Sequence, residues 1–411
     1  MDRIIVGIDV GTTKICTLVG QVDDHGGLRV IGVGVVPARG VRKGVITDIE
    51  EAAQAIGEAV NKAERVSGHT ISEAYVSVGG GHISSQNSRG IVAIGKGDRP
   101  VDRDDIERAM ESAQAVAVPH NRRIIHSIPR EFIIDGQDGI KNPLGLMGFR
   151  LEVEAHIVTG AMTSIQNLLQ CMERNGIEVL DLVLQPLASA EAVLTEEEKN
   201  MGVALVDMGG GTTDTAIYVE GSVWDTLVFA VGGNHITTDI AMGLRTPFAT
   251  AEDIKIRYAH ANPGAVEPSE VIEITTFGED NLRTISRQEL CKIVALRTDE
   301  MFDLIHREIK RSGFDSLLPA GVVITGGTAG LRGIRELVAH KFQAPVRIGM
   351  PRRLQGLTEA ISSPAYATGV GLLLWGMKEE AAAVESGPRS MGNGLWHQRL
   401  LEWLKVFLPR G

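Results

Sequence analysis

Two short segments, far apart in the chain, combine acidic, glycine and hydroxyl residues in a spacing suited to phosphate chemistry. The first reads Ile4-Ile-Val-Gly-Ile-Asp-Val-Gly-Thr-Thr-Lys14, and the second reads Val203-Ala-Leu-Val-Asp-Met-Gly-Gly-Gly-Thr-Thr-Asp214. Each contains an apolar strand, an aspartate at its end, a glycine turn and two threonines. Glycine lets a backbone approach a ligand closely, and the N–H groups of such a turn form a concave anion site. Both segments are therefore candidate phosphate-binding turns.

The pairing of the two turns carries more weight than either turn alone. An isolated turn of this kind is equally compatible with an ordinary β-hairpin, but here two copies lie 198 residues apart (207 − 9). Facing each other, they would surround a triphosphate, with Asp9 and Asp207 holding Mg²⁺ directly or through water and Lys14 adding positive charge. The predicted nucleotide-binding residues of the two turns are Asp9, Gly11, Thr12, Thr13, Lys14, Asp207, Gly209, Gly210, Gly211, Thr212, Thr213 and Asp214.

Further glycine turns could complete a nucleotide site. The segment from Val322 to Gly330 runs from a strand into a glycine loop, so Gly326, Gly327 and Thr328 could approach a nucleoside. Gly232 and Gly233 precede a helical pattern and are a fainter signal of the same kind. The chain contains neither a Gly-Lys-Ser/Thr P-loop nor a strand-following Gly-x-Gly-x-x-Gly. Phosphate binding must therefore come from the paired turns.

The composition is that of a folded, acidic protein. The 411 residues are 43% hydrophobic and 23% charged, and Lys+Arg 41 against Asp+Glu 52 gives a net charge of −11. This balance argues against a broad nucleic-acid footprint. The three cysteines fit neither a disulfide framework nor a zinc site. We expect a cytoplasmic protein without a signal peptide or a transmembrane helix, because no apolar run approaches the required length.

The elements that must position these turns alternate between strands and helices. Apolar runs at Ile4–Ile8, Tyr75–Val78, Val203–Val206 and Val322–Ile324 predict strands, and Ile49–Ser67 predicts a helix, which favours an α/β fold. A helix over Val101–Ala117 and strands over Arg123–Ile134 and Phe149–Val158, around the turn-rich Gly136–Gly148, indicate a small inserted domain. A second small unit is expected between Thr246 and Arg307, where helices over Ala251–Ala261 and Ser286–Glu308 flank a strand near Val271–Thr275.

The chain ends in a polar tether and an amphipathic segment. Residues 378–394 have the composition of a flexible linker. In the helix predicted over 395–408, Gln398, Glu402 and Lys405 lie opposite the apolar face. Such a helix suits the interface of an anionic bilayer, although it could instead dock on its own body or on a partner. The predicted membrane residues are Leu395, Trp396, Arg399, Leu400, Trp403, Leu404, Lys405 and Phe407.

Together these motifs resemble those of the actin, sugar-kinase and Hsp70 superfamily. The Asp9 and Asp207 turns look like its phosphate-1 and phosphate-2 motifs, and Gly326-Gly-Thr328 looks like its adenosine motif. Gln185-Pro186 resembles connect-1, which makes Gln185 a candidate for orienting the attacking water, and Tyr366-Ala-Thr-Gly369 resembles connect-2. Ala251-Glu252-Asp-Ile-Lys255 resembles the helix that contacts adenosine. The resemblance therefore implies ATP and Mg²⁺ as ligands, with Glu252 and Lys255 near the base or ribose.

Within the superfamily, the sequence resembles the FtsA family of bacterial cell-division proteins. Asn142-Pro-Leu-Gly-Leu-Met-Gly-Phe-Arg-Leu-Glu-Val153 resembles the family's inserted subdomain 1C. The resemblance implies a two-lobed actin-like fold around a nucleotide cleft. It divides the chain into subdomain 1A (1–83, 164–194 and 359–377), subdomain 1C (84–163), subdomain 2A (195–246 and 305–358), subdomain 2B (247–304), a linker (378–394) and a membrane helix (395–408).

The resemblance also implies a function. An ATP-bound filament would bind the cytoplasmic face of the cell membrane at midcell, recruit the ring protein FtsZ through subdomain 2B and help recruit later division proteins. Arg297 is then a candidate contact for the acidic FtsZ C-terminal peptide. We expect slow or negligible ATP hydrolysis rather than metabolic catalysis. The alternatives are a PilM-like pilus-assembly ATP-binding protein and a small-molecule kinase, whereas an Hsp70-type chaperone would need a further domain.

Overall fold

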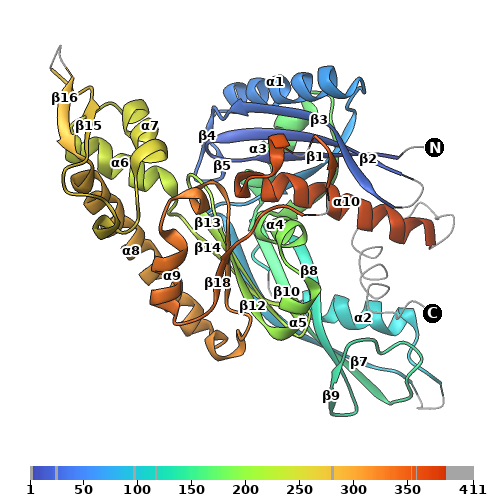
Figure 1. The fold of residues 1–411 in the computed structure, drawn as a ribbon. Coiled ribbons are helices and arrows are strands. Elements are labelled where there is room, and N and C mark those ends of the chain that lie inside the picture. The colour runs from blue at the N-terminus through green and yellow to red at the C-terminus, as the bar shows by residue number, and fades with distance from the viewer. Residues whose placement is uncertain are drawn as a thin grey trace.

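The computed structural model consists of two lobes built around two β-sheets (Figure 1). It describes residues 3–23, 26–95, 99–115, 118–278, 282–352, 354–357 and 359–385. The apolar runs at Ile4–Ile8, Tyr75–Val78, Val203–Val206 and Val322–Ile324 all lie in strands. The predicted α/β class is therefore confirmed.

The first lobe is organised around a six-stranded sheet with the order β11-β6-β1-β2-β3-β19. Its strands are β1 (Arg3–Val10), β2 (Lys14–Val22), β3 (Leu28–Pro37), β6 (Glu73–Val78), β11 (Glu178–Leu184) and the short β19 (Gln355–Gly356). Strands β1, β2 and β3 form an antiparallel meander, whereas β6 runs parallel to β1 and β11 runs parallel to β6. The first phosphate turn therefore lies at the tip of the β1–β2 hairpin.

The second lobe repeats this plan with five strands in the order β14-β13-β12-β17-β18. They are β12 (Val203–Met208), β13 (Thr213–Val219), β14 (Ser222–Phe229), β17 (Val322–Thr325) and β18 (Val346–Ile348). Again an antiparallel meander is followed by a parallel strand, because β17 runs parallel to β12. Strand β12 is buried along its whole length, as the continuous apolar run predicts. The internal sequence resemblance thus reflects two matching half-structures.

Helices cover both sheets and connect the lobes. The first lobe carries α1 (Ile49–Ser67), α3 (Met162–Glu173), α4 (Gln185–Val193) and α10 (Ala367–Glu385), and the second carries α5 (Glu196–Met201), α6 (Gly233–Leu244), α7 (Phe248–Tyr258), α8 (Arg287–Ser312) and α9 (Ile334–Phe342). Helix α1 has the predicted limits because Asp48 caps its first turn and Gly68 ends it with φ +74°. Helices α4 and α10 pack on each other.

Short elements complete the two lobes. The first contains the strand pair β4 (Val41–Arg42) and β5 (Val45–Ile46). The second contains β15 (Val271–Ile274) and β16 (Arg283–Ser286), of which only β15 was predicted. Single 3₁₀ turns lie at Pro263–Ala265, Asp315–Leu317, Gly327–Gly330, Glu359–Ile361 and Pro364–Tyr366. Helices α7 and α8 differ from their predicted limits by a few residues, and α8 continues past the expected 2B boundary at 304.

A separate four-stranded sheet is inserted between β6 and α3. It has the order β7-β10-β8-β9, formed by β7 (Ile83–Ala93), β8 (Arg122–Ile134), β9 (Gln137–Ile140) and β10 (Arg150–Ala161), with α2 (Arg103–Gln114) packed on it. The predicted helix is shorter than Val101–Ala117 because Asp102 is its N-cap. Strand β9 falls in the stretch expected to be turn-rich, since the turn that begins at Asp135 closes a hairpin.

The inserted sheet has a hydrophobic core of its own. Phe132, Met110, Ile106 and Leu151 are fully buried in it. Gly90 permits the close approach of α2, because a Cβ there would lie 2.0 Å from the carbonyl oxygen of Ala109. We call this unit, residues 83–161, the inserted subdomain.

The end of the described chain corrects one boundary. Helix α10 continues to Glu385, so residues 378–385 are helical and not part of a flexible linker. Lys378 forms an ion pair with Glu191 on α4, and the Glu- and Ala-rich sequence that follows favours a helix. The remaining predicted linker and the amphipathic segment 395–408 lie outside the described residues. Among the described helices, none combines the length and hydrophobicity needed to cross a bilayer.

Candidate functional site

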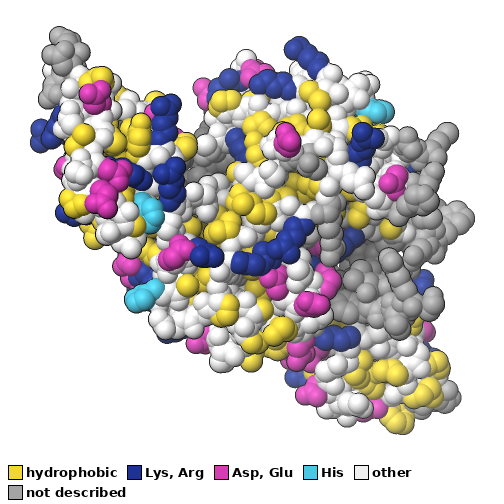
Figure 2. All heavy atoms as spheres, viewed as in Figure 1, with side chains coloured by type: hydrophobic (Ala, Val, Ile, Leu, Met, Phe, Trp, Pro, Cys, Tyr) yellow, Lys and Arg dark blue, Asp and Glu magenta, His cyan; other side chains and the backbone are white. Residues whose placement is uncertain are grey.

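A cavity of about 380 Å³ lies between the lobes, where the two phosphate turns meet. Figure 2 shows a hollow between the arm formed by α6, α7 and α8 and the body around the first sheet. The predicted residues that line the cavity are Asp9, Gly11, Thr12, Thr13, Lys14, Gln185, Asp207, Gly209, Gly210, Gly211, Thr212, Asp214, Gly233, Glu252, Lys255, Gly326, Gly327 and Thr328. Sequence positions more than 300 residues apart thus converge on one site.

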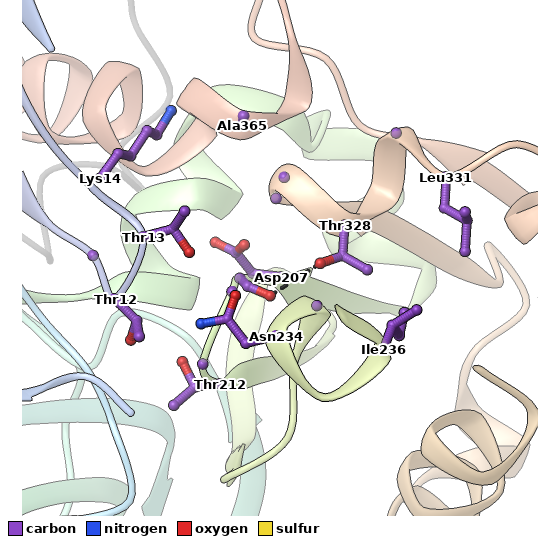
Figure 3. Close-up of a pocket in the computed structure, with 18 of the residues that line it drawn as sticks. Thr12, Thr13, Lys14, Asp207, Thr212, Asn234, Ile236, Thr328, Leu331 and Ala365 are labelled. Carbon is purple, nitrogen blue, oxygen red and sulfur yellow. Dashed lines mark hydrogen bonds between the residues drawn. The ribbon is translucent and has the colours of Figure 1, made fainter. Parts of the chain in front are cut away.

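The two turns have the same geometry and face each other (Figure 3). In the first, the Gly11 N–H donates to the carbonyl oxygen of Lys14 at 3.0 Å, and in the second Gly209 donates to Thr212 at 2.9 Å. A Cβ on Gly210 would lie 1.9 Å from Thr13 Oγ1, so the turns are in close contact. The absence of side chains on these glycines lets an anion approach the turn backbones closely, where N–H groups that are not used within the turns can bind it.

Two predicted residues support the cavity without lining it. Thr213 donates its hydroxyl to the carbonyl oxygen of Val231 at 2.8 Å, which fixes the start of β13. Gly232 packs under the second turn, where a Cβ would lie 2.7 Å from the carbonyl oxygen of Gly209. Both residues therefore hold the turn in place from behind.

Asp9 and Asp207 lie at the bottom of the cavity and are both buried. Ser77 donates a hydrogen bond of 2.8 Å to Asp9, and Ser189 donates one to Asp207. Burial raises the pKa of Asp9, and burial also raises the pKa of Asp207 to about 6, because a charged carboxylate loses its hydration there. A divalent cation would offset that cost.

Asp214 places a third carboxylate at the cavity wall. Thr212 Oγ1 donates to its Oδ2 at 2.9 Å, whereas its buried Oδ1 has no hydrogen-bond partner among the described residues. Burial and the neighbouring Asp207 raise the pKa of Asp214 to about 7. An unpartnered acceptor atom in such a position fits a ligand that brings a cation or bound water.

The carboxyls of Asp9, Asp207 and Asp214 bind protons more tightly in the folded protein than in the unfolded chain. The free energy of unfolding should therefore fall as the pH rises from about 4 to about 7. We expect Asp214→Asn to remove much of this slope and to raise the melting temperature of the nucleotide-free protein by several degrees at pH 8 but little at pH 4. A pKa difference of one corresponds to about 1.4 kcal/mol. Thermal unfolding at several pH values measures this. Glu173→Gln, at an exposed site on α3, is the control, and an equal response in both variants would contradict the prediction.

Lys14 carries the positive charge nearest the first turn, but its side chain does not point straight at the second. Its Nζ lies 3.5 Å from the centre of the Tyr366 ring and has no hydrogen-bond partner among the described residues. Figure 3 shows the side chain directed toward the segment that carries Ala365. Burial lowers the pKa of Lys14. An unpartnered buried ammonium beside a glycine cradle fits an anionic ligand such as phosphate.

The cavity also suits the predicted magnesium ion when a nucleotide supplies further ligands. In the described part of the chain, no three His, Cys, Asp or Glu side chains converge on one point as a metal site would require. Mg²⁺ usually takes one or two carboxylates, several waters and substrate phosphates. Asp9 and Asp207 could serve in that way.

The opposite end of the cavity has the properties of a nucleoside site. Lys255 Nζ donates to Glu252 at 2.7 Å and to Thr237 at 2.9 Å, so these side chains form a network between α6 and α7. Gly326 has φ +85°, and Thr328 donates to the carbonyl oxygen of Gly209 at 3.0 Å, which ties the third glycine turn to the second phosphate turn. The nucleoside and phosphate ends are therefore joined.

Ten residues that line the cavity escaped the sequence interpretation. They are Gly44, Asn234, Ile236, Ile256, Ala259, Gly330, Leu331, Arg332, Ala365 and Thr368. Asn234 follows a glycine pair that was recognised, and Thr368 lies inside the recognised connect-2 segment, so proximity in the sequence could have suggested both. The apolar residues had no such signal.

Gln185 and Arg297 have other partners in the structure. Gln185 begins α4 and hydrogen-bonds to Asp9, which gives it a role in fixing that carboxylate. Arg297 on α8 forms an ion pair with Asp239 on α6, with Nε 2.5 Å from Oδ2 and Nη2 3.0 Å from Oδ1, and it also contacts Glu300. A guanidinium engaged in this way is not a freely available peptide-binding group.

The two matching half-structures around a cleft, with a glycine turn from each, define the actin-like fold class. Solved structures share this fold: PilM of a PilM-PilN type IV pilus biogenesis complex (TM-score 0.67, 15% identity, 91% of this chain and 98% of that chain), and MreB 5 of Spiroplasma citri bound to AMPPNP (TM-score 0.55, 16% identity, 94% and 99%). At these identities the likeness concerns the fold alone.

Sequence comparison places the chain within that class. The family model "Cell division protein FtsA" matches residues 204–371, and "SHS2 domain inserted in FTSA" matches residues 80–159. The cell division protein FtsA of Pseudomonas aeruginosa is 46% identical over 379 residues, covering 92% of this chain and 90% of its own length. That of Neisseria meningitidis is 40% identical over 409 residues, 98% of both chains. The chain belongs to the FtsA family of cell-division proteins, and the pilus-assembly alternative is not favoured.

Proposed function

We propose that this protein binds Mg-ATP in the cavity between its lobes and polymerises on the cytoplasmic face of the cell membrane, where it anchors the FtsZ ring. The observation that carries the proposal is the pair of opposed phosphate turns, beside which Lys14 Nζ and Asp214 Oδ1 are buried with no hydrogen-bond partner in the described part of the chain. Membership of the FtsA family supplies the division role. The protein would then act at midcell as a peripheral membrane protein and help recruit later division proteins.

In this proposal, the residues around a bound nucleotide have distinct tasks. Backbone N–H groups of both turns would hold the phosphates, with Lys14 moving from the Tyr366 ring toward them, and Asp9 and Asp207 would hold Mg²⁺ through water. When bound, the metal would neutralise phosphate charge. Glu252 and Lys255 would contact the ribose or base. We also propose the subdomain division given by the sequence, with the linker beginning after Glu385.

Membrane attachment would come from the segment 395–408. One interfacial helix binds weakly and reversibly, whereas a filament presents many copies, so avidity would make binding depend on polymerisation. The test is co-sedimentation with anionic liposomes, with and without Mg-ATP, of the full chain and of a truncation after Glu385. That end point preserves α10 and its ion pair with Glu191. Pelleting of the full chain, increased by ATP and lost on truncation, supports the proposal, whereas a full chain that stays soluble contradicts it.

The FtsZ contact remains a proposal for the surface around Arg297, and the ion pair with Asp239 allows a sharp test. If Arg297 binds the acidic FtsZ peptide directly, Asp239→Asn should free the guanidinium and strengthen peptide binding by roughly two- to fivefold, while Arg297→Ala weakens it. Fluorescence anisotropy of a labelled acidic FtsZ C-terminal peptide measures both. If the ion pair only joins α6 to α8, the two variants will weaken binding alike, and the assignment of Arg297 is wrong.

A further inference from the structure

The inserted subdomain contacts both lobes, although it is covalently part of the first. The chain enters it from β6 through Gly79, Gly80 and Gly81, and the Gly80 backbone lies close enough to Asp214 of the second phosphate turn to favour its charged form. Its sheet also packs against β14, the edge strand of the second lobe. A rotation that opens the cleft must therefore change one of these two attachments.

The contact with β14 is made of specific hydrogen bonds. Successive outward-facing positions of β7 supply two of them: the Ser85 hydroxyl donates to the Thr226 carbonyl oxygen at 2.7 Å, and Asn87 Nδ2 donates to the Trp224 carbonyl oxygen at 3.3 Å. His156 on β10, directly opposite Asn87, lies 2.7 Å from Asn87 Oδ1 and 2.9 Å from Thr226 Oγ1. We call these five residues the brace interface.

The hydrogen bonds of the brace interface define its geometry closely. Asn87 uses its amide nitrogen on Trp224, so its Oδ1 accepts from His156 Nδ1, and His156 Nε2 then accepts from the Thr226 hydroxyl. His156 and Thr226 are both buried, so an unmade bond here would not be replaced readily by water.

A second row of contacts continues the interface toward the far end of β14. The Ser222 hydroxyl donates to the Arg130 carbonyl oxygen at 3.1 Å, and the Arg130 guanidinium lies 4.1 Å from the centre of the Trp224 ring. Trp224 in turn packs edge-on against Phe314. The subdomain is thus attached to β14 from Ser222 to Thr226 and not at a single point.

Strand β14 connects the brace interface to the nucleotide cavity. It pairs with β13, which starts at Thr213 in the second phosphate turn, and Phe229 at the end of β14 lies opposite Thr213. In this structure the phosphate turns are in close contact while every brace hydrogen bond is made. Contact between the two phosphate turns and an intact brace interface therefore occur in the same conformation.

We propose that the inserted subdomain is a brace that holds the cleft closed, so that nucleotide binding and attachment of the subdomain to β14 stabilise each other. The inference rests on the nucleotide binding proposed above. By linkage, a partner that pulled the subdomain away from β14 would loosen the nucleotide, and nucleotide binding would oppose that partner to the same degree. The affinity of the subdomain for proteins that bind it would thus depend on whether nucleotide occupies the cleft.

The test compares a double variant at the brace interface with a serine-to-alanine change inside the subdomain. Ser85 donates across the brace interface, whereas the buried Ser88 donates at 2.6 Å to Ala113 inside the subdomain. We expect Ser85→Ala combined with Thr226→Val to speed release of a fluorescent ATP analogue by roughly fivefold to a hundredfold, since each lost hydrogen bond contributes roughly two- to twelvefold. Ser88→Ala should lower the melting temperature without changing the release rate.

Hydrogen exchange of the β14 amides gives a second readout. In the wild-type protein, Mg-ATP should slow exchange in β14 and β7 together, and the double variant should lose the effect in β7. The brace proposal is wrong if the double variant releases nucleotide at the wild-type rate. It is also wrong if Ser88→Ala accelerates release as much as the double variant does. If the wild-type protein binds no ATP analogue at all, the nucleotide site itself is wrong.

Discussion

Replacing Gly210 by valine should lower ATP affinity by about a hundredfold while both lobes stay folded. A Cβ at this position would lie 1.9 Å from Thr13 Oγ1, 3.2 Å from Thr13 Cβ and 3.4 Å from Asn234 Oδ1, and valine adds two further methyl groups. The Thr13 hydroxyl must then rotate away, and the added methyl groups press on Thr13 Cβ and Asn234 and push the two phosphate turns apart, which moves their N–H groups away from the phosphates. Overpacking of this kind costs about 1–3 kcal/mol, and each 1.4 kcal/mol corresponds to a tenfold change in affinity.

A matched glycine provides the control for this prediction. Gly81 lies in the glycine loop after β6, and a Cβ there would have no other heavy atom within 4 Å, so Gly81→Val should bind ATP like the wild-type protein. Titration with a fluorescent ATP analogue measures affinity, and thermal unfolding checks that the variants are folded. Wild-type affinity in Gly210→Val would show that the turns do not close on the ligand as described.

The fold was predictable because its strongest signals are local. The buried strands are continuous apolar runs, and α1 begins at an aspartate cap and ends at a glycine with positive φ, so even its limits were correct. Strands β9 and β16 were missed because they are short, four-residue edge segments whose partners lie in the adjacent hairpin. Pairing between strands, not composition, forms such elements.

The chemistry at the cavity was more predictable than its shape. Asp9, Asp207 and the glycines were identified from the sequence because few residue types can bind phosphate and metal. Apolar residues such as Ile256 and Leu331 line the same cavity, but their type does not distinguish them from core residues. Conversely, the pairing of Arg297 with Asp239 joins positions 58 residues apart, and only the packing of α6 on α8 brings them together.

The limit of α10 illustrates a third kind of error. Residues 378–385 were assigned to a linker because polar and small residues dominate the whole stretch from Lys378 to Gly394. The helix nevertheless continues, since the ion pair between Lys378 and Glu191 secures it at the body of the protein. Composition averaged over a segment does not locate the point at which tertiary contacts end.

That boundary bears directly on how the terminal segment would work. If the tether starts after Glu385, residues 386–394 span at most about 30 Å when fully extended. A segment 395–408 on such a tether would lie within reach of a bilayer only when α10 ends near the membrane. We therefore expect attachment to depend on the orientation of the protein in a filament as well as on the hydrophobic face of the segment.

Trp403→Glu should abolish pelleting with anionic liposomes. Trp403 lies on the predicted apolar face, so the change removes a large apolar side chain that would enter the bilayer and puts a carboxylate near anionic headgroups. Loss of about 2–3 kcal/mol for one helix corresponds to a contact weaker by roughly thirtyfold to 150-fold, and avidity multiplies that loss along a filament. Co-sedimentation at increasing liposome concentration measures the effect.

The control introduces the same charge on the other face of the same helix. Gln398→Glu adds one glutamate at a position predicted to face water, so it should reduce pelleting only slightly and the reduction should disappear at higher salt. A general effect of negative charge would weaken both variants alike. In that case the segment binds by charge attraction alone, and the assignment of an apolar face inserted into the bilayer is wrong. Full loss in Trp403→Glu with near-normal binding in Gln398→Glu requires a helix that buries one face in lipid.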